Sequence, residues 1–229
     1  MVLSDRQKLI LHTLIKEYIK SAQPVASGIL VEKYRLDISP ATVRNELMFL
    51  EESGYIYQPH TSAGRVPTES AYILEIEALS GKKKELKGSD KEVIDRALDK
   101  SAESLKPVAR ALAELSGNAV FWAFHKNDLY HTGLSNLFAQ PEFRQAETVC
   151  DVSLVIDRME EIIDDLFNDL PEGSRIFLGG ANPFGAFLGT SLLKYRYQGV
   201  SGLCGILGPL RMDYSRNLAL LHYLQAHFK

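Results

Sequence analysis

The sequence predicts an α+β protein in which a small domain of helices and one hairpin precedes a larger domain built on an antiparallel sheet. Three observations support this prediction. Residues 1–54 carry three short helical patterns, and a hairpin pattern that contains prolines follows them. A lysine-rich stretch between two glycines then interrupts the patterns. Beyond it, the order is helix, hairpin, helix, three strands and helix.

The first helix is expected to begin after Ser4, because Ser4 and Gln7 have the spacing of a capping box. Apolar residues then repeat at helical spacing until about Ser21. Residues 26–34 predict a short second helix, which ends before a polar turn.

Ser39 and Pro40 predict the N-cap and the first turn of a third helix, which Gly54 would end. Residues 55–69 have the pattern of a hairpin whose prolines confine it to a sheet edge. Three helices followed by a hairpin is the order of a winged helix-turn-helix domain. The apolar residues that would pin the third helix to the core are Val43, Leu47 and Leu50.

The lysine-rich stretch marks the expected domain boundary. It gives a winged-helix domain over residues 1–80, a linker over 81–88 and an α+β domain over 89–229. A solvated tether explains its lysines better than a contact with DNA does. In the second domain, Ser89 and Glu92 suggest a capping box for a helix that Pro107 bends or splits. The later elements are expected as a hairpin with its turn at 126–128, a helix over 142–169, strands over 174–180, 186–197 and 200–207, and a helix from Asp213.

Composition excludes the unusual classes of protein. Hydrophobic residues make up 45% and charged residues 24% of the 229 residues, which is ordinary globular usage. The charged N-terminal pattern predicts neither a signal peptide nor a membrane anchor, and the two cysteines suit a reducing compartment, so a cytoplasmic location is expected. The uncharged stretch over 176–193 is broken by glycines and a proline, which favours a buried strand-turn-strand.

The third helix offers side chains that can read bases. Turning its apolar residues inward brings small and polar residues near its N-terminus to the flanks and the outer face. Arginine can hold guanine bidentately, asparagine can do the same with adenine, and alanine can accept a thymine methyl. A solvated helix face with an ordinary capping serine fits the same spacing equally well. The candidate DNA-reading residues are Ser39, Ala41, Thr42, Arg44 and Asn45.

The hairpin loop adds four candidate phosphate donors, His60, Thr61, Ser62 and Arg65, and Arg65 is also long enough to enter a minor groove. Net charge gives no support, because the chain has 26 Lys and Arg against 29 Asp and Glu, and residues 1–80 have eight against ten. A single module would therefore bind DNA weakly. Useful affinity would require a dimer on a repeated site.

Three segments together resemble the HrcA family of bacterial heat-inducible transcription repressors. They are SPATVRNELMFLEESGYIYQPHTSAGRVPT, GLSNLFAQPEF and ILGPLRMDY. The resemblance implies a winged-helix domain, a GAF-like domain and a homodimer that binds an inverted-repeat operator ahead of chaperone genes. It also implies a bacterial chaperonin as a partner that keeps the repressor active.

One departure from the family concerns a dimerisation domain inserted within the GAF-like part. Here the chain passes almost directly from Phe121–Phe124 to Gly133–Asn136, so the insertion is expected to be absent. Dimerisation would then depend on the helices over 89–116 or on the sheet domain.

Other readings of the sequence are weaker. The strands offer apolar interiors rather than a ligand pocket, residues 177–183 suit a tight turn better than a phosphate nest, and the six histidines lack zinc spacing. The carboxylates Glu160, Glu161, Asp164 and Asp165 suit a solvated helix face, and no nucleophile is arranged for catalysis. No enzyme activity, cofactor or metal is expected. The alternative function is a ligand- or protein-sensing adaptor that uses the winged helix as an interaction surface.

Overall fold

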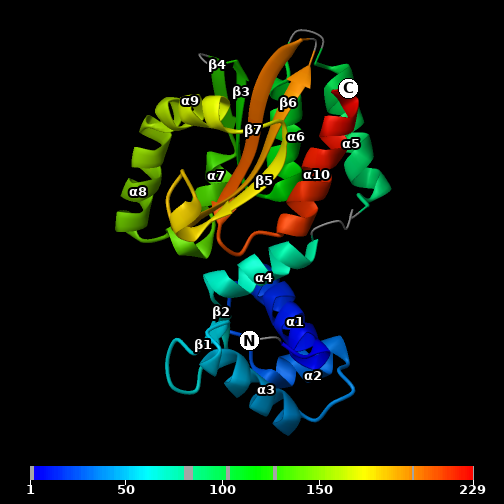
Figure 1. The fold of residues 1–229 in the computed structure, drawn as a ribbon, viewed down its shortest axis with the longest axis vertical. Coiled ribbons are helices and arrows are strands. Elements are labelled where there is room, and N and C mark those ends of the chain that lie inside the picture. The colour runs from blue at the N-terminus through cyan, green and yellow to red at the C-terminus, as the bar shows by residue number, and fades with distance from the viewer. Residues whose placement is uncertain (1–2, 80–84, 102–103, 126–127, 198, 229) are drawn as a thin grey trace. The chain divides into compact units, whose positions relative to one another are not determined.

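The computed structural model describes residues 3–79, 85–101, 104–125, 128–197 and 199–228. The chain divides into two compact units, Met1–Lys82 and Lys83–Lys229 (Figure 1). Each unit has a buried apolar core of its own. Residues 81–84 of the expected linker lie outside the described residues, and Gly88 at its far end begins a helix.

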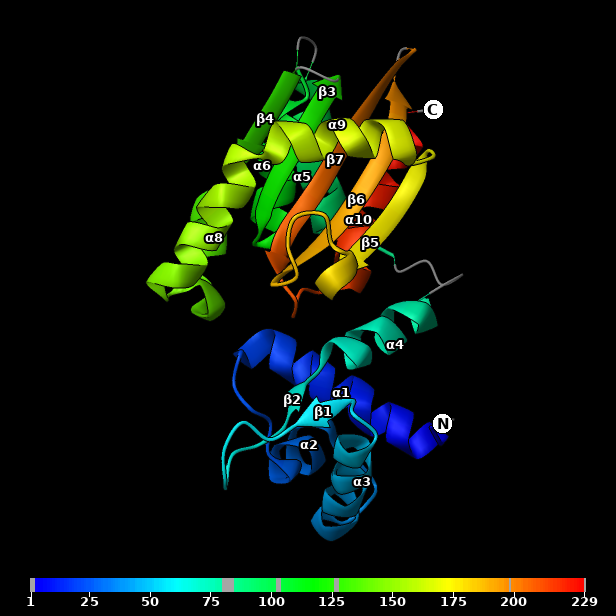
Figure 2. The ribbon, with the colours of Figure 1, turned by 60° about the vertical axis from the view of Figure 1, so that its left-hand side comes forward.

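The first unit has the winged helix-turn-helix order that the sequence predicts (Figure 2). The capping box at Ser4 is confirmed, because its Oγ accepts a hydrogen bond from the backbone N–H of Gln7 and the Gln7 side chain accepts one from the Ser4 N–H. The elements are α1 (Asp5–Ser21), α2 (Ser27–Tyr34), α3 (Pro40–Glu52), β1 (Ile56–Tyr57), β2 (Val66–Pro67) and α4 (Glu69–Leu79).

A buried carboxylate ties α3 to the start of α1. Glu46 of α3 is 7% exposed, although it lies in a helix whose outer face is polar. Its two oxygens accept hydrogen bonds from Arg6 Nε at 2.7 Å and Gln7 Nε2 at 3.0 Å. Gln7 therefore both caps α1 and orients α3.

A second buried carboxylate ties α1 to α2. Glu17, 6% exposed, accepts hydrogen bonds from Lys33 Nζ at 2.7 Å and from the Tyr34 hydroxyl at 2.9 Å. The hydrogen bond from Lys33 lowers the pKa of Glu17 below its usual 4.5. Burial and the same carboxylate raise the pKa of Tyr34 to about 12. Glu17 is thus held ionised and the Tyr34 hydroxyl protonated at neutral pH.

The second unit is built on an antiparallel sheet with the strand order β4-β3-β7-β6-β5. Neighbouring strands pair antiparallel throughout this order, and the pairing of β6 with β7 is the longest, from Leu188 opposite Pro209 to Tyr197 opposite Val200. The strands are β3 (Ala119–His125), β4 (Asp128–Thr132), β5 (Gly173–Leu178), β6 (Leu188–Tyr197) and β7 (Val200–Pro209).

Helices cover both faces of this sheet, which gives the GAF-like α+β arrangement (Figure 2). Along β3, Phe121 belongs to a core that includes Met159, Ile163 and Leu166 of α9. The next residue, Trp122, is also fully buried and points to the opposite face. The covering helices are α5 (Gly88–Asp99), α6 (Lys106–Ser116) and α10 (Tyr214–His227) on one face and α8 (Ala146–Asp157) and α9 (Met159–Asp169) on the other.

The sequence predictions for the starts of two helices in this unit, α5 and α6, differ from the structure. The capping box at Ser89 and Glu92 is wrong, because the N-cap of α5 is Lys87, two residues before Ser89, and no side chain caps this helix. Pro107 splits the helical pattern rather than bending it, since its fixed φ suits the first turn of α6.

The helix expected over 142–169 is interrupted. Residues Pro141–Phe143 form a 3-10 turn, and Arg158 separates α8 from α9. The break lets residues of both helices face one side of the sheet. The second hairpin strand ends at Thr132, because Gly133 has a positive φ of 74° and starts α7 (Leu134–Phe138). Lys126 and Asn127 of the expected hairpin turn lie outside the described residues.

The uncharged stretch forms a strand-turn-strand, as expected, with a 3-10 turn over Gly179–Ala181 between β5 and β6. Asn182 is buried in this turn, where its side chain donates to Leu188 O at 2.7 Å and accepts from Phe184 N and Thr190 Oγ1. Within the described residues, no helix has the length and apolar content that crossing a bilayer requires.

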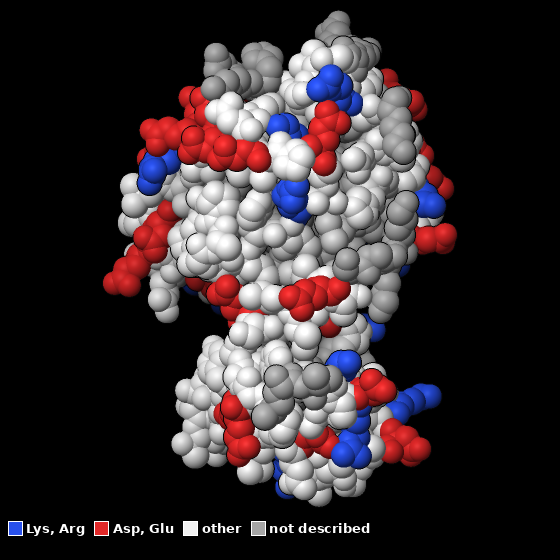
Figure 3. All heavy atoms as spheres, in the orientation of Figure 1, with Lys and Arg blue, Asp and Glu red and all other residues white. Residues whose placement is uncertain are grey.

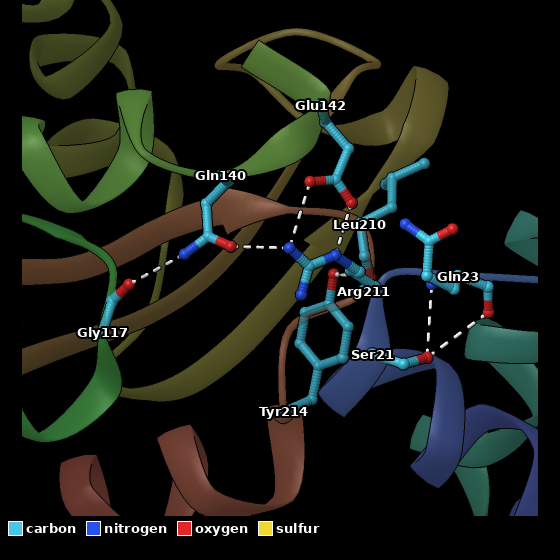
Figure 4. A network of polar contacts seen from close by, with 8 residues as sticks. All are labelled: Ser21, Gln23, Gly117, Gln140, Glu142, Leu210, Arg211 and Tyr214. Atoms are coloured by element: carbon cyan, nitrogen blue, oxygen red, sulfur yellow. Dashed lines mark hydrogen bonds and ion pairs between the residues drawn. The ribbon is translucent and has the colours of Figure 1, made fainter. Parts of the chain in front are cut away.

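A buried arginine links two segments that are far apart in the sequence (Figure 4). Arg211 follows β7, and its guanidinium donates to both carboxylate oxygens of Glu142 and to Gln140 Oε1 at 2.6 Å. Gln140 in turn donates to Gly117 O. Asp213 caps α10 as expected, by accepting from Arg216 N at 2.8 Å.

Candidate nucleic-acid interface

The N-terminal end of α3 is set by its cap. The Ser39 Oγ accepts from Thr42 N at 3.1 Å and lies 2.9 Å from Thr42 Oγ1, and Pro40 occupies the first turn. Because its Oγ accepts from the backbone N–H of Thr42, Ser39 acts as the N-cap of α3, and its hydroxyl also forms a hydrogen bond with the hydroxyl of Thr42. The cap orders the first turn, where the remaining candidates lie.

The outer face of α3 carries most of the expected DNA-reading residues. Ala41, Arg44 and Asn45 are exposed, as is Ser39, and Thr42 is half-buried. The opposite face is buried through Val43, Leu47 and Leu50, which are at most 4% exposed. The helix end is therefore uncovered within its own unit.

The hairpin loop is closed by its own hydrogen bonds. Gln58 Nε2 donates to Ala63 O at 2.9 Å, and Ala63 N donates to His60 O at 3.0 Å. Ser62 has a positive φ of 69°, which completes the turn. His60, Thr61 and Ser62 are exposed at this tip, where they can donate to a neighbouring anion.

Arg65 lies at the base of the hairpin, and its surroundings differ from those of the tip. Its side chain is 17% exposed, and a terminal nitrogen lies 2.9 Å from Glu51 Oε2 of α3. Its backbone forms a β-bridge with Val25, with hydrogen bonds of 2.9 and 2.8 Å. Sequence reasoning grouped it with the tip and gave no sign of Glu51 or Val25, because both contacts join residues distant in the chain.

A cavity of about 290 Å³ lies beside these residues. Its wall comes from the start of α2, the flank of α3 and the base of the hairpin. The sequence pattern did not point to it, since only the folded chain brings the three segments together. The lining residues are Val25, Ala26, Ser27, Arg44, Leu47, Met48, Ser62, Ala63, Gly64 and Arg65.

Ion pairs hold part of the carboxylates of the first unit. Of the ten carboxylates in residues 1–80, those of Glu17, Glu46, Glu51 and Glu75 pair with Lys33, Arg6, Arg65 and His12. Arg44 and Arg35 are exposed. Each pair with Lys or Arg removes one positive and one negative charge, so the acidic excess of the unit is unchanged and the positive charge on the outer face of α3 comes from Arg44.

The carboxylate candidates of the sequence belong to the second unit. In the second unit, carboxylates gather over α9 (Figure 3), and Glu160, Glu161 and Asp165 are exposed there. Among the described residues, no three His, Cys, Asp or Glu side chains are placed to hold a metal ion.

Two family models match the chain. One, described as winged helix-turn-helix transcription repressor, HrcA DNA-binding, covers residues 2–80, and the other, described as HrcA protein C terminal domain, covers residues 76–218. Together they extend over almost all of the chain.

Curated relatives are each described as a heat-inducible transcription repressor HrcA. The relative from Roseiflexus sp. (strain RS-1) is 27% identical over 340 aligned positions, which cover 98% of this chain and 93% of the relative. The relative from Roseiflexus castenholzii is 61% identical over 77 residues, 34% of this chain and 21% of that protein. Since 340 positions exceed the 229 residues of this chain, at least 111 of them hold residues of the RS-1 relative alone.

A crystal structure described as that of a hypothetical protein has the same fold. It matches with a TM-score of 0.77 at 18% identity, over 99% of this chain and 98% of that one.

Proposed function

The chain belongs to the HrcA family of heat-inducible transcription repressors, and we propose that it represses chaperone genes by binding an inverted-repeat operator as a homodimer. The N-terminal end of α3 reads base edges in the major groove, and the hairpin tip grips the sugar-phosphate backbone. The protein acts in the cytoplasm by occupying the operator and blocking transcription.

The observation that carries this proposal is the uncovered end of α3. Arg44 and Asn45 are exposed on it beside Ala41, above a buried apolar stripe that fixes the rotation of the helix. Arginine and asparagine are the side chains best suited to bidentate contacts with guanine and adenine. Ala41 is small enough to allow close approach to the groove.

Weak attraction by one module supports a dimer. The first unit has ten Asp and Glu against eight Lys and Arg, so a single copy has little electrostatic attraction for phosphates. Two modules on one repeated site gain from effective concentration. The proposed dimer contact lies in the second unit, and a bacterial chaperonin is the proposed partner that keeps the repressor active.

A mobility-shift titration against an inverted-repeat chaperone promoter, run beside sedimentation at the same concentration, tests operator choice and stoichiometry together. Arg44→Ala and Asn45→Ala are expected to weaken discrimination at particular bases by about 1–3 kcal/mol. Lys8→Ala, at an exposed position of α1, serves as the control. Equal losses on operator and random DNA in the helix variants would contradict the assignment.

A further inference from the structure

The cavity of about 290 Å³ in the first unit has the chemistry of an anion site. Arg44 and Arg65 line it together with the hydroxyls of Ser27 and Ser62, and no Asp or Glu is among its lining residues. We infer that this cavity binds one phosphate group of the DNA backbone. The inference rests on the proposed function and deepens it, because it names the chemical group and the residues that receive it.

Arg65 is fixed in the orientation that such a site needs. Glu51, which lies outside the lining, holds a terminal nitrogen of its guanidinium at 2.9 Å. The Nε atom of Arg65 is buried and has no hydrogen-bond partner among the described residues. Because this atom has almost no accessible surface, a phosphate would meet the terminal nitrogens of the 17%-exposed side chain, which can donate charge-assisted hydrogen bonds to it.

The start of α2 supplies a second set of donors. Its N-cap residue is Ala26, which has no side chain able to accept from the first turn. The backbone N–H groups of that turn are therefore left without a side-chain cap, and the helix dipole is positive at this end. Ala26 and Ser27 both line the cavity, so this end of α2 lies at its wall and Ser27 is the residue of the first turn that borders it. Together with two arginines, this helix end favours a negatively charged group.

The floor of the cavity is rigid because two backbones meet there. The β-bridge joins Val25 to Arg65, and Gly64 lies against the same segment. A Cβ atom at residue 64 would lie 2.5 Å from the carbonyl carbon of Val25 and 2.6 Å from that of Pro24, so only glycine fits. A site that is ordered before its ligand arrives loses less entropy on binding.

The position of the cavity favours DNA over a free phosphate compound as the source of the phosphate. Arg44 belongs both to the lining and to the exposed face of α3, and Ser62 belongs both to the lining and to the hairpin tip. A strand that follows α3 towards the hairpin would therefore pass the mouth of the cavity. A small phosphorylated ligand would have no need of these two shared residues.

The test couples a protein variant to single phosphates of the operator. Wild-type protein and Arg65→Gln are titrated by fluorescence anisotropy against operators that each carry one neutral methylphosphonate. We expect the wild type to lose about tenfold in affinity at one phosphate of each half-site. Arg65→Gln should bind the unmodified operator about tenfold more weakly than the wild type does. Neutralising that same phosphate should cause no further loss of affinity in this variant. Additive losses at every phosphate would overturn the inference.

Two further variants control for fold and for general charge. Lys8→Gln removes an exposed positive charge of the same unit outside the cavity, and it should keep the wild-type sensitivity at every phosphate. If thermal unfolding shows that Arg65→Gln is not folded, Ser27→Ala gives the same readout with a smaller loss, about threefold. A Ser27→Ala variant with purely additive losses would also overturn the inference.

Titration of the wild type with inorganic phosphate separates the two sources of phosphate. The DNA assignment would be overturned by two results together: inorganic phosphate binds the wild type saturably but not Arg65→Gln, and no methylphosphonate position in the operator shows a non-additive loss with Arg65→Gln. Normal preference for the operator without a coupled phosphate would refute this inference alone. Failure of the wild type to prefer the operator over random DNA would refute the proposed function instead.

Discussion

The two units fix their helices by different interactions. In the winged-helix unit, the buried carboxylates of Glu17 and Glu46 join three helices, and the apolar core is small. In the GAF-like unit, both faces of the sheet are covered by apolar and aromatic side chains, and the charged contacts join partly exposed side chains, such as Arg211 with Glu142 and Arg216 of α10 with Asp90 of α5. The arrangement of the DNA-binding elements therefore depends on buried carboxylates in addition to the apolar stripe of α3, whereas that of the sheet depends mainly on apolar packing.

The largest effect is expected from a substitution that creates a cavity in the apolar core of the GAF-like unit. Phe121 is fully buried, and its ring lies 5.1 Å from that of Phe184. Phe121→Ala should lower the free energy of unfolding by about 3–5 kcal/mol. Trp122 is the single tryptophan and lies in this unit, so its fluorescence during denaturant unfolding reports the change. A loss below about 1 kcal/mol would show that packing of the apolar core does not determine the stability of this unit.

The next effect concerns the charged contact between distant segments. Arg211→Ala leaves Glu142 and Gln140 without their shared donor, and a loss of about 2 kcal/mol is expected. The same tryptophan signal measures it. Arg158→Ala is the matched control, because Arg158 pairs with an exposed Glu161 and should change stability by less than about 0.5 kcal/mol. Equal losses of stability in Arg211→Ala and Arg158→Ala would mean that the lower exposure of the Arg211 contact does not increase its contribution.

A smaller loss is expected at Glu46, whose carboxylate ties α3 to the start of α1 beside the apolar stripe of α3. Arg6 is 56% exposed and regains water once the carboxylate is removed, so Glu46→Ala should cost about 1–2 kcal/mol. Hydrogen exchange in α1 and α3 measures this change. Glu52→Ala, at an exposed position of the same helix, should leave exchange unchanged. Faster exchange confined to the sheet unit would contradict the role of Glu46.

The smallest effect is the response of the first unit to acid. Because the folded pKa of Glu17 lies below its usual 4.5, the ionised carboxylate stabilises the folded unit at higher pH. That contribution is lost as pH falls from about 4.5 through the lowered pKa, and it should be below about 1 kcal/mol. Hydrogen exchange in α2 between pH 3 and 6 should show the loss in the wild type and a weaker dependence in Glu17→Gln. An identical dependence in both proteins would exclude Glu17.

Local signals in the sequence predicted most of the winged-helix unit. Caps at Ser4 and Ser39 mark the starts of α1 and α3, and both act within one turn of the chain. The same reasoning gave the wrong start for α5 near Ser89 and missed the break at Arg158. α5 packs against α6 and α10, and α9 packs against the sheet; these contacts between distant segments are absent from the local sequence pattern.

The candidate interface was predictable only in part. Exposure of Arg44 and Asn45 follows from the helical repeat, which the residues themselves supply. The pairing of Arg65 with Glu51 and its bridge to Val25 join residues 14 and 40 positions apart, and no periodicity encodes them. For the same reason the cavity was absent from the sequence-based list of sites.

The short distance between Gly64 and Val25 limits how this repressor can change over evolution. The bridge to Val25 fixes one end of the hairpin loop, and the hydrogen bond from Gln58 to Ala63 closes the other. Insertions that lengthen the hairpin are therefore tolerated only across Pro59–Ser62. Under the proposed function, drift towards new operators is then expected to run through substitutions on α3, and changes in the reach of the loop along the duplex are confined to its tip.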